Sequence, residues 1–221
     1  MSLLTSHEFG AQCYPALNQY LSMRLEEFSS IPAGRKSDLV KVSQYMQGCF
    51  TKSQPAKLTF ICTHNSRRSH LSQIWAQVAA DSFGISNLET FSGGTEATAF
   101  NPRAVAAMQR SGLKITTADA DATNPRYEVR TNDIAKAQVC FSKVYDTPPN
   151  PTAGYCAIMT CSQADDACPL VMGCELRMPI RYADPKIADD TDEEAALYDE
   201  RSRQICLEML FMMSRVVTHD G

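Results

Sequence analysis

A cysteine, an arginine and several small polar side chains lie close together in one stretch of this sequence. Residues 58–72 read LTFICTHNSRRSHLS, in which five residues separate Cys62 from Arg68. Cys62 follows a short apolar and β-branched run, residues 58–61, that is typical of a buried strand. After Arg68, apolar residues recur at helical spacing, which predicts a helix that begins near the arginine. The cysteine therefore ends a strand, and the arginine stands at the start of a helix.

A loop of this length, placed between a strand and a helix, can hold a tetrahedral oxyanion. Its backbone N–H groups can point inward, and the helix N-terminus adds unpaired N–H groups and partial positive charge. Arg68 would clamp two oxygens with its planar fork, and the same field favours the nucleophilic thiolate of Cys62. The alternative is a structural cysteine beside a solvent-facing arginine. The predicted oxyanion-binding loop consists of Thr63, His64, Asn65, Ser66, Arg67, Arg68 and Ser69.

Composition argues against several other classes of function. The chain has 221 residues, 21% charged residues and a net charge of −4, so nucleic-acid binding has no electrostatic support. No apolar run approaches the ~20 residues that span a bilayer, and no secretory signal is recognisable at the start. Most of the nine cysteines are expected to be reduced thiols in a cytoplasmic protein.

Residues 1–55 predict a helical extension ahead of a catalytic domain at 56–221. Apolar residues recur at helical spacing on both sides of a break that contains Pro32 and Gly34. Three interpretations stay open for this helical hairpin: packing on the catalytic core, a homodimer interface, or a lid over the active site.

The catalytic domain alternates strands with helices. Asn101 and Pro102 are a good cap and first-turn residue for one helix, and a last helix is predicted over 193–217. Residues 116–133 are polar and are predicted to be loop with a little helix. The alternation predicts an α/β fold with a central parallel sheet of about four strands and helices on both faces. The predicted strands are residues 58–61, 88–94, 137–141 and 155–160.

A second group of cysteines follows the last of these strands. Cys161 and Cys168 are separated by six residues in the run CSQADDACP, which is rich in small polar residues and is predicted to be a loop. The alternatives are a zinc site, simple packing, or a redox relay between thiols. The gaps between the four nearby cysteines do not match the paired spacing of structural zinc sites, so no metal is predicted. Those four are Cys156, Cys161, Cys168 and Cys174.

These motifs resemble a known family. CTHNSRRS and FSGGTEATAFNPRAVAAMQRSGL are similar to segments of the low-molecular-weight tyrosine phosphatases and of the thioredoxin-coupled arsenate reductases built on the same fold. The resemblance runs from about residue 58 to residue 217 and implies a three-layer fold around a four-stranded parallel sheet. It also implies that Asp184, which precedes a proline, is the general acid that protonates a leaving oxygen. A plain turn aspartate is the alternative.

The sequence departs from the family pattern at three positions. The family usually has glycine at His64 and a cysteine at Arg67, and the reductases have a potassium-binding glutamate at Gln73. A side chain at the glycine position is expected to strain the loop. Arg67 is expected either to add positive charge at the rim or to point to solvent.

The run CSQADDACP resembles the relay segment of the arsenate reductases. The resemblance implies that Cys161 is the first resolving thiol and Cys168 the second, with thioredoxin as external reductant and no bound cofactor. Two enzymes remain possible at Cys62: reduction of arsenate to arsenite, or hydrolysis of a phosphomonoester such as phosphotyrosine through a phospho-cysteine. A non-catalytic oxyanion-binding or redox-sensing module is the third interpretation. No nucleic-acid or membrane partner is expected.

Overall fold

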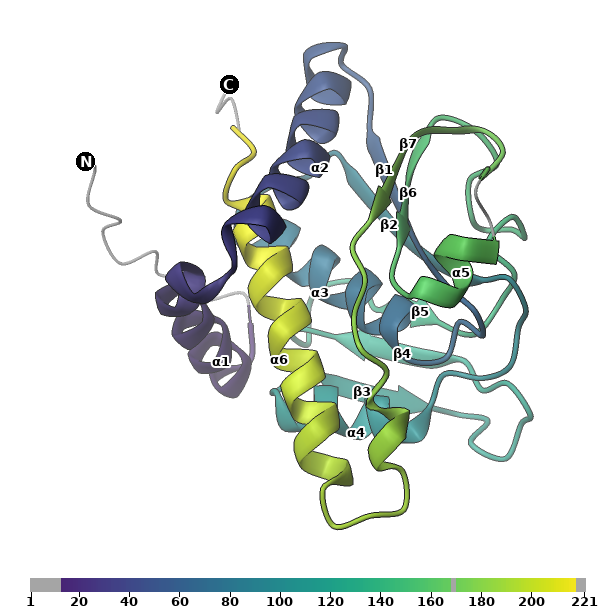
Figure 1. Ribbon diagram of the computed structural model, residues 1–221. Coiled ribbons are helices and arrows are strands. Elements are labelled where there is room, and N and C mark those ends of the chain that lie inside the picture. The colour runs from purple at the N-terminus through teal and green to yellow at the C-terminus, as the bar shows by residue number, and fades with distance from the viewer. Residues whose placement is uncertain (1–12, 168–169, 218–221) are drawn as a thin grey trace.

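A four-stranded parallel sheet forms the centre of the molecule (Figure 1). The computed structural model describes residues 13–167 and 170–217. The strand order is β2-β1-β6-β7, so β1 is an inner strand, and nearly all of its residues are buried. Parallel strands end at the same edge of a sheet, and β1 delivers Cys62 to that edge. The strands are β1 (Ala56–Cys62), β2 (Leu88–Gly94), β6 (Tyr155–Met159) and β7 (Cys174–Pro179).

Helices cover both faces of this sheet, as predicted. The larger core lies between the sheet and the long helices α3 (Arg68–Ser82) and α6 (Glu194–Met213), and it includes Phe60 and Ile158. A smaller apolar cluster on the other face includes Ile61 and Ala157 and is covered by the short helix α5 (Ser162–Ala167). Because side chains alternate across a strand, neighbouring residues of β6 serve the two cores.

One strand prediction and part of one loop prediction are wrong. A separate three-stranded antiparallel sheet, in the order β3-β4-β5, contains the strand predicted at 137–141, so that strand is not part of the parallel sheet. The end of β3 and the whole of β4 lie within 116–133, which had been predicted as loop. Its strands are β3 (Lys114–Thr117), β4 (Tyr127–Arg130) and β5 (Gln138–Cys140). They are three or four residues long and mostly polar, and short polar strands of this kind give little periodic signal.

The fourth strand of the parallel sheet is β7, which the sequence did not predict. Its sequence, CELRMP, buries only Met178, because β7 lies at the edge of the sheet. The segment between Cys161 and Gly173, predicted to be loop, contains the helix α5 (Ser162–Ala167). One turn of polar residues has too few apolar positions to reveal a helix.

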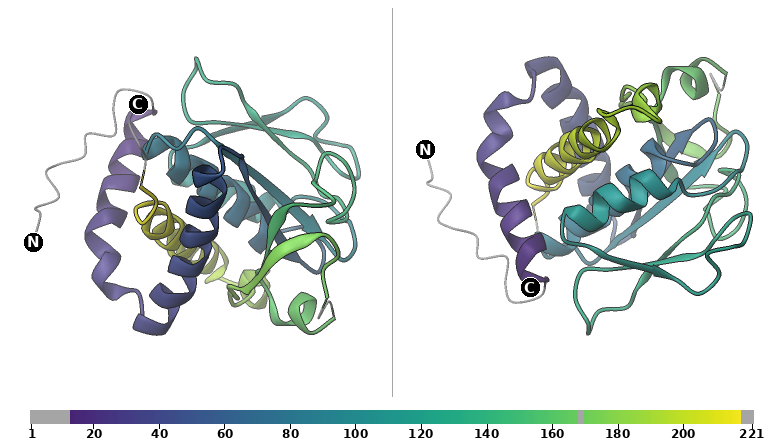
Figure 2. Two further views of the ribbon diagram at one scale, coloured as in Figure 1. Left: turned by 90° about the horizontal axis from the view of Figure 1, so that it is seen from above. Right: turned by 90° about the horizontal axis from the view of Figure 1, so that it is seen from below.

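The helical extension is confirmed for the described part of residues 1–55. It consists of α1 (Pro15–Glu26), a 3₁₀ turn η1 (Glu27–Ser30) and α2 (Ala33–Thr51), which pack along α6 (Figure 2). Side chains of the two helices enter the larger core and are fully buried, among them Leu17, Leu21, Leu39, Val42 and Met46. The apolar stripes are therefore used for packing on the catalytic core, the first of the three interpretations.

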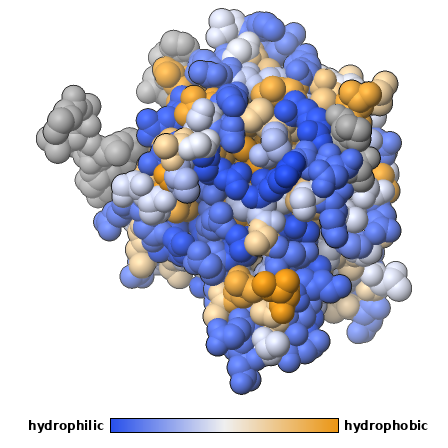
Figure 3. Space-filling model, viewed as in Figure 1, coloured by the Kyte–Doolittle hydropathy of each residue, from blue (hydrophilic) through white to orange (hydrophobic). Residues whose placement is uncertain are grey.

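The remaining helix is α4 (Pro102–Arg110). It begins as predicted: the Asn101 side chain accepts a hydrogen bond from the Arg103 backbone N–H at 2.9 Å. The face of the molecule in Figure 3 is mainly hydrophilic, with apolar side chains in small groups. Within the described residues, no helix is long and apolar enough to cross a membrane.

If the extension is part of the main core, truncating one of its buried leucines will destabilise the whole protein. Leu39 is fully buried against the larger core. We expect Leu39→Ala to lower the free energy of unfolding by about 2–5 kcal/mol in a urea titration. Met23→Ala, at a position that is 51% exposed in α1, is the control and should change it by less than about 0.5 kcal/mol. A separate early transition for the extension would contradict a shared core.

Candidate active site

Cys62 lies buried at the point where β1 ends and the loop to α3 begins. Its Sγ is 3.0 Å from the hydroxyl of Ser69. That hydroxyl oxygen accepts a hydrogen bond from Asn65 Nδ2 at 2.9 Å, and its own proton can be donated to the sulfur. Donation to sulfur favours the thiolate over the thiol. The geometry thus prepares a nucleophile at Cys62.

Asn65 gives the loop its shape. It has a positive φ of 44°, a conformation that asparagine tolerates better than most residues. Its side-chain oxygen accepts from the backbone N–H of Lys143 at 2.9 Å. Its amide also lies 3.5 Å from Nδ1 of His70. Burial lowers the pKa of His70 to about 3, so this imidazole is neutral and adds no charge beneath the loop.

His64 occupies its position without a left-handed backbone. The positive φ expected where the family has glycine is found at Asn65 instead. The His64 imidazole is turned outward, 2.9 Å from Glu96, and its carbonyl accepts hydrogen bonds from the hydroxyls of Thr98 and Ser142. The predicted strain at His64 is therefore absent from this loop.

The loop is anchored on the end of β2 and on the start of α4. The carbonyls of Thr63 and Ser66 accept from the backbone N–H groups of Glu96 and Asn101, each at 2.9 Å. Gly94 makes the first contact possible, since a Cβ atom there would lie 2.6 Å from the Thr63 carbonyl oxygen. Only glycine allows the two backbones to approach this closely.

Arg68 and Asp184 are in direct contact. Arg68 is the first residue of α3, and its guanidinium donates to the carboxylate of Asp184 at 2.7 Å and to the Tyr182 carbonyl at 3.1 Å. The other Asp184 oxygen caps a 3₁₀ turn, η2 (Pro185–Ala188), by accepting from the Lys186 backbone N–H at 3.1 Å. The residues predicted as clamp and general acid are thus brought together, and an oxyanion bound by Arg68 would compete with Asp184 for its donors.

Arg67 is neither free at the rim nor directed to solvent, the two outcomes expected from the sequence. Its Nε donates to the hydroxyl of Tyr198 at 2.8 Å, and another of its nitrogens is 3.5 Å from the carboxylate of Asp189. Tyr198 also donates to Asp189 at 2.8 Å. Asp189 is largely buried in this group, with its side chain 16% exposed. Arg67 therefore ties the loop to α6 and to the end of η2.

A second thiol lies beside the loop. Cys161 is fully buried at the start of α5, and its Sγ is 3.6 Å from the hydroxyl of Thr63, the residue that follows Cys62. The Cys161 sulfur also accepts from the Ala164 backbone N–H at 3.3 Å. Cys62 and Cys161 belong to the same small apolar cluster. Cys168, the third predicted thiol, lies outside the described residues.

No metal centre is found in the part of the chain that the structure describes. Within it, no group of three or more His, Cys, Asp or Glu side chains is placed to hold a metal ion. Gln73, at the position of the reductases' potassium-binding glutamate, is buried and donates to the Thr90 carbonyl at 3.2 Å. Its side-chain oxygen has no hydrogen-bond partner, but one neutral amide oxygen supplies less charge than a carboxylate would.

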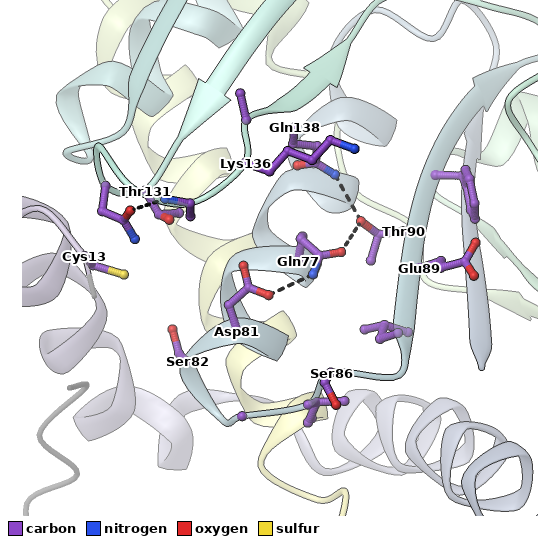
Figure 4. Close-up of a pocket in the computed structure, with 17 residues that line it drawn as sticks. Cys13, Gln77, Asp81, Ser82, Ser86, Glu89, Thr90, Thr131, Lys136 and Gln138 are labelled. Carbon is purple, nitrogen blue, oxygen red and sulfur yellow. Dashed lines mark hydrogen bonds between the residues drawn. The ribbon is translucent and has the colours of Figure 1, made fainter. Parts of the chain in front are cut away.

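A cavity of about 970 Å³ lies away from this loop (Figure 4). It is bounded by the last turn of α3, the first residues of β2 and the small sheet. Thr90 links its walls, donating to Gln77 and accepting from Gln138, each at 3.1 Å. Because the opposite end of β2, at Gly94, touches the loop, this cavity is separate from the site of Cys62.

Sequence reasoning missed two groups that hold the site together. Tyr182 supports Arg68 through its backbone carbonyl, and His70 supports Asn65 from beneath the loop. A tyrosine in a polar run and a histidine on an apolar helix give no pattern that marks such roles. The one feature of the sequence that could have drawn attention to Tyr182 is its position two residues before Asp184.

The hydrogen bond to sulfur predicts the reactivity of Cys62. Ser69→Ala removes the hydroxyl that faces Cys62, so we expect alkylation of Cys62 by iodoacetamide at neutral pH to slow roughly tenfold, as expected for losing a hydrogen bond to a charged group. The rate is read by mass spectrometry of the Cys62 peptide. Ser72→Ala is a matched control, because it removes a buried hydroxyl that bonds the Arg68 carbonyl one turn away. Equal rates in the two variants would contradict this role of Ser69.

Comparisons with known proteins fit this geometry. Over 145 residues, the chain is 28% identical to arsenate reductases from Bacillus licheniformis and Bacillus subtilis strain 168, covering 65% of this chain and 84% of each relative. An arsenate reductase from Halalkalibacterium halodurans is 27% identical over 61% of this chain and 78% of its own length. No protein-family model matches the chain.

Solved structures with some likeness were also found. They include a low-molecular-weight phosphotyrosine phosphatase from Vibrio cholerae O395, with a TM-score of 0.48 and 12% identity over 72% of this chain and 95% of the other. A mutant of YwlE from Bacillus subtilis has a TM-score of 0.44 and 12% identity over 72% and 97%.

The loop from Cys62 to Arg68 stands at the strand-to-helix junction that its chemistry needs. Together with the similarity to arsenate reductases over 136–145 residues, this geometry is that of a cysteine-dependent oxyanion enzyme.

Proposed function

We propose that the protein reduces arsenate to arsenite. The observation that carries this proposal is the buried thiol of Cys161, 3.6 Å from the hydroxyl of Thr63 and in one apolar cluster with Cys62. A phosphatase hydrolyses its phospho-cysteine with water and needs no second thiol beside the nucleophile. The names of the sequence relatives support the same conclusion.

In the first step, the thiolate of Cys62 attacks the arsenic atom of arsenate. Arg68 and the loop amides hold the oxyanion, and this displaces Asp184 from the Arg68 donors that it occupies at 2.7 Å. Asp184, in its protonated form, gives its proton to the departing oxygen, which leaves as water. A sulfur–arsenic bond has formed, an arsenic–oxygen bond has broken, and arsenic is still As(V).

In the second step, the thiolate of Cys161 attacks the sulfur of Cys62. The sulfur–arsenic bond breaks, its electron pair stays on arsenic, and arsenite leaves as As(III) while Cys62 and Cys161 become a disulfide. The backbone N–H of Ala164 donates to the Cys161 sulfur at 3.3 Å and holds it beside the loop. This step requires the two sulfurs to approach bonding distance.

In the third step, Cys168 resolves that disulfide. Its thiolate attacks the Cys161 sulfur, the thiolate of Cys62 leaves, and a Cys161–Cys168 disulfide forms. A dithiol protein such as thioredoxin then reduces this disulfide by the same exchange chemistry. Such a reductant implies a reducing compartment, the cytoplasm, which agrees with the free cysteines among the described residues.

Phosphomonoester hydrolysis is the second candidate, because Cys62, Arg68 and Asp184 also suffice for a phospho-cysteine mechanism. The observation that favours the reductase over this second candidate is the buried Cys161 thiol beside the loop, which hydrolysis of a phospho-cysteine would not need.

The assigned role of Asp184 is tested with aryl phosphates as surrogate substrates. We expect Asp184→Asn to slow hydrolysis of esters with poor leaving groups by roughly 10²-fold or more, and those with good leaving groups much less, because only a poor leaving group needs the proton. The measurement is the dependence of kcat on leaving-group pKa. Equal slowing across the series would assign Asp184 a structural role through its contact with Arg68.

The reductase proposal is tested at Cys161. Cys161→Ser should abolish NADPH consumption with arsenate, thioredoxin and thioredoxin reductase, yet keep most of the p-nitrophenyl phosphate hydrolysis, since hydrolysis needs no second thiol. Cys13→Ser, which alters a half-buried cysteine on the far cavity, is the control and should leave both activities unchanged.

A second variant follows the relay itself. Cys168→Ser should stall after one turnover with Cys62 and Cys161 joined, a linkage that mass spectrometry of the peptides will detect. If wild-type protein consumes no NADPH with arsenate and neither disulfide ever forms, the protein is a phosphatase instead.

A further inference from the structure

The segment that carries the general acid is held by two arginines. This acid segment, residues 180–184, joins β7 to η2. The carbonyl of Arg181 accepts a hydrogen bond from the guanidinium of Arg35 at 2.6 Å. The next carbonyl, that of Tyr182, accepts from the guanidinium of Arg68 at 3.1 Å. Two consecutive peptide groups therefore connect Arg35 to the oxyanion clamp.

Arg35 also reaches the side chains beneath this segment. Its guanidinium is 3.5 Å from the carboxylate of Glu208 and 5.4 Å from the centre of the Tyr182 ring. Tyr182 donates its own hydroxyl to Glu208 at 2.8 Å. Glu208 also accepts from Gln204 at 3.2 Å. Arg35, Tyr182 and Glu208 thus form one connected group that fixes both the backbone and the ring at position 182.

Because Glu208 is buried, the charged form of its carboxylate depends on the nearby guanidinium of Arg35. The Glu208 side chain is only 4% exposed, and burial raises its pKa, while Arg35 acts in the opposite direction. A buried carboxylate that loses its charged partner is strongly destabilised or takes up a proton. Either change would alter the hydrogen bond that Glu208 accepts from Tyr182.

The acid segment also leads to the helix of the second thiol. The Arg181 side chain forms an ion pair with Asp165 of α5, and Arg177 pairs with the same carboxylate. Asp165 is buried, so this pairing fixes α5, which starts after Cys161. Arg35 therefore holds the backbone at a point from which both Asp184 and α5 are positioned.

We propose that Arg35, in the N-terminal helical extension, is a positioning residue for the oxyanion site. It fixes the acid segment so that the Tyr182 carbonyl orients Arg68 and so that Asp184 lies beside the clamp. The extension then contributes to catalysis as well as to the core, although it lies ahead of the region in which the chain resembles its family. The kinetic test of this inference rests on the proposed function, whereas the oxyanion-binding test does not.

The test compares Arg35→Met with the wild-type chain. Methionine keeps an unbranched apolar stem against Tyr182 and removes the charge and all donors. Displacing a catalytic group by about 1 Å can cost on the order of 10²-fold, so we expect kcat/KM for arsenate and for p-nitrophenyl phosphate to fall at least tenfold. Arg35→Lys should recover part of that loss, because an ammonium can still pair with Glu208 but cannot also reach the Arg181 carbonyl.

Ser43→Ala is the matched control. Ser43 is buried on the same helix and donates to the Met212 carbonyl of α6 at 2.7 Å, so its loss weakens the same helix packing without touching the acid segment. We expect Ser43→Ala to lower Tm while kcat/KM stays within about twofold of wild type. If Ser43→Ala lost as much activity as Arg35→Met, or if Arg35→Met kept wild-type kinetics, Arg35 would have no specific positioning role.

Oxyanion binding separates this inference from the proposed function. Protection of Cys62 from iodoacetamide by inorganic phosphate or arsenate reports the state of the clamp without any turnover. We expect Arg35→Met to need severalfold more oxyanion for half-protection. If oxyanions protect Cys62 of the wild-type protein but the protein turns over neither substrate, the proposed function is refuted. The comparison of oxyanion protection between wild type and Arg35→Met would still test the inference. Equal protection in wild type and Arg35→Met would overturn the inference.

Discussion

The contact between Arg68 and Asp184 joins residues 116 positions apart in the chain, and the site depends on it. Arg68 comes from the junction of an inner strand with a long helix, both of which are rigid and buried. Asp184 comes from a connection that follows an edge strand and has much less inherent order. The molecule compensates by fastening that connection from several sides: through the Thr160 carbonyl to the Tyr182 N–H, through Arg35, and through the Arg67 group beyond η2.

The two sides of the site are held differently. The loop around Cys62 is fixed by backbone contacts, by Asn65 and by the hydroxyls of Thr98 and Ser142, so that its N–H groups keep a fixed geometry for a tetrahedral anion. The acid segment is held instead by arginine side chains, since Arg35 and Arg68 donate to its carbonyls and Arg68 also pairs with Asp184. The Arg68–Asp184 ion pair can be exchanged for contacts with a bound anion, whereas backbone anchors cannot.

The sequence predicted the placement of residues best where the pattern is local. Cys62 and Arg68 are close in the chain, and the strand before them and the helix after them have strong apolar patterns, so their arrangement was predictable. Asp184 was predictable only through the resemblance to a family. The roles of Arg35, Tyr182 and Glu208 could not be predicted from the sequence. Arg35 is more than a hundred residues away from its partners in the chain, and no spacing in the sequence marks these contacts. The small antiparallel sheet was missed for a different reason. Its strands are three or four residues long and each buries one apolar residue, Ile115, Val129 or Cys140, so no alternating pattern is visible in the sequence.

The polar residues of β7, which prevented its prediction as a strand, also affect how the edge of the sheet can interact with other chains. It is the outer strand of the parallel sheet, and one side of its backbone has no neighbour in the strand order. An outer strand of continuous apolar residues would be a template on which another chain could add a strand. β7 carries Glu175 and Arg177 and ends at Pro179, and charges and proline are the features that discourage such pairing. The polar residues that gave no strand prediction thereby discourage association through the open edge of the sheet.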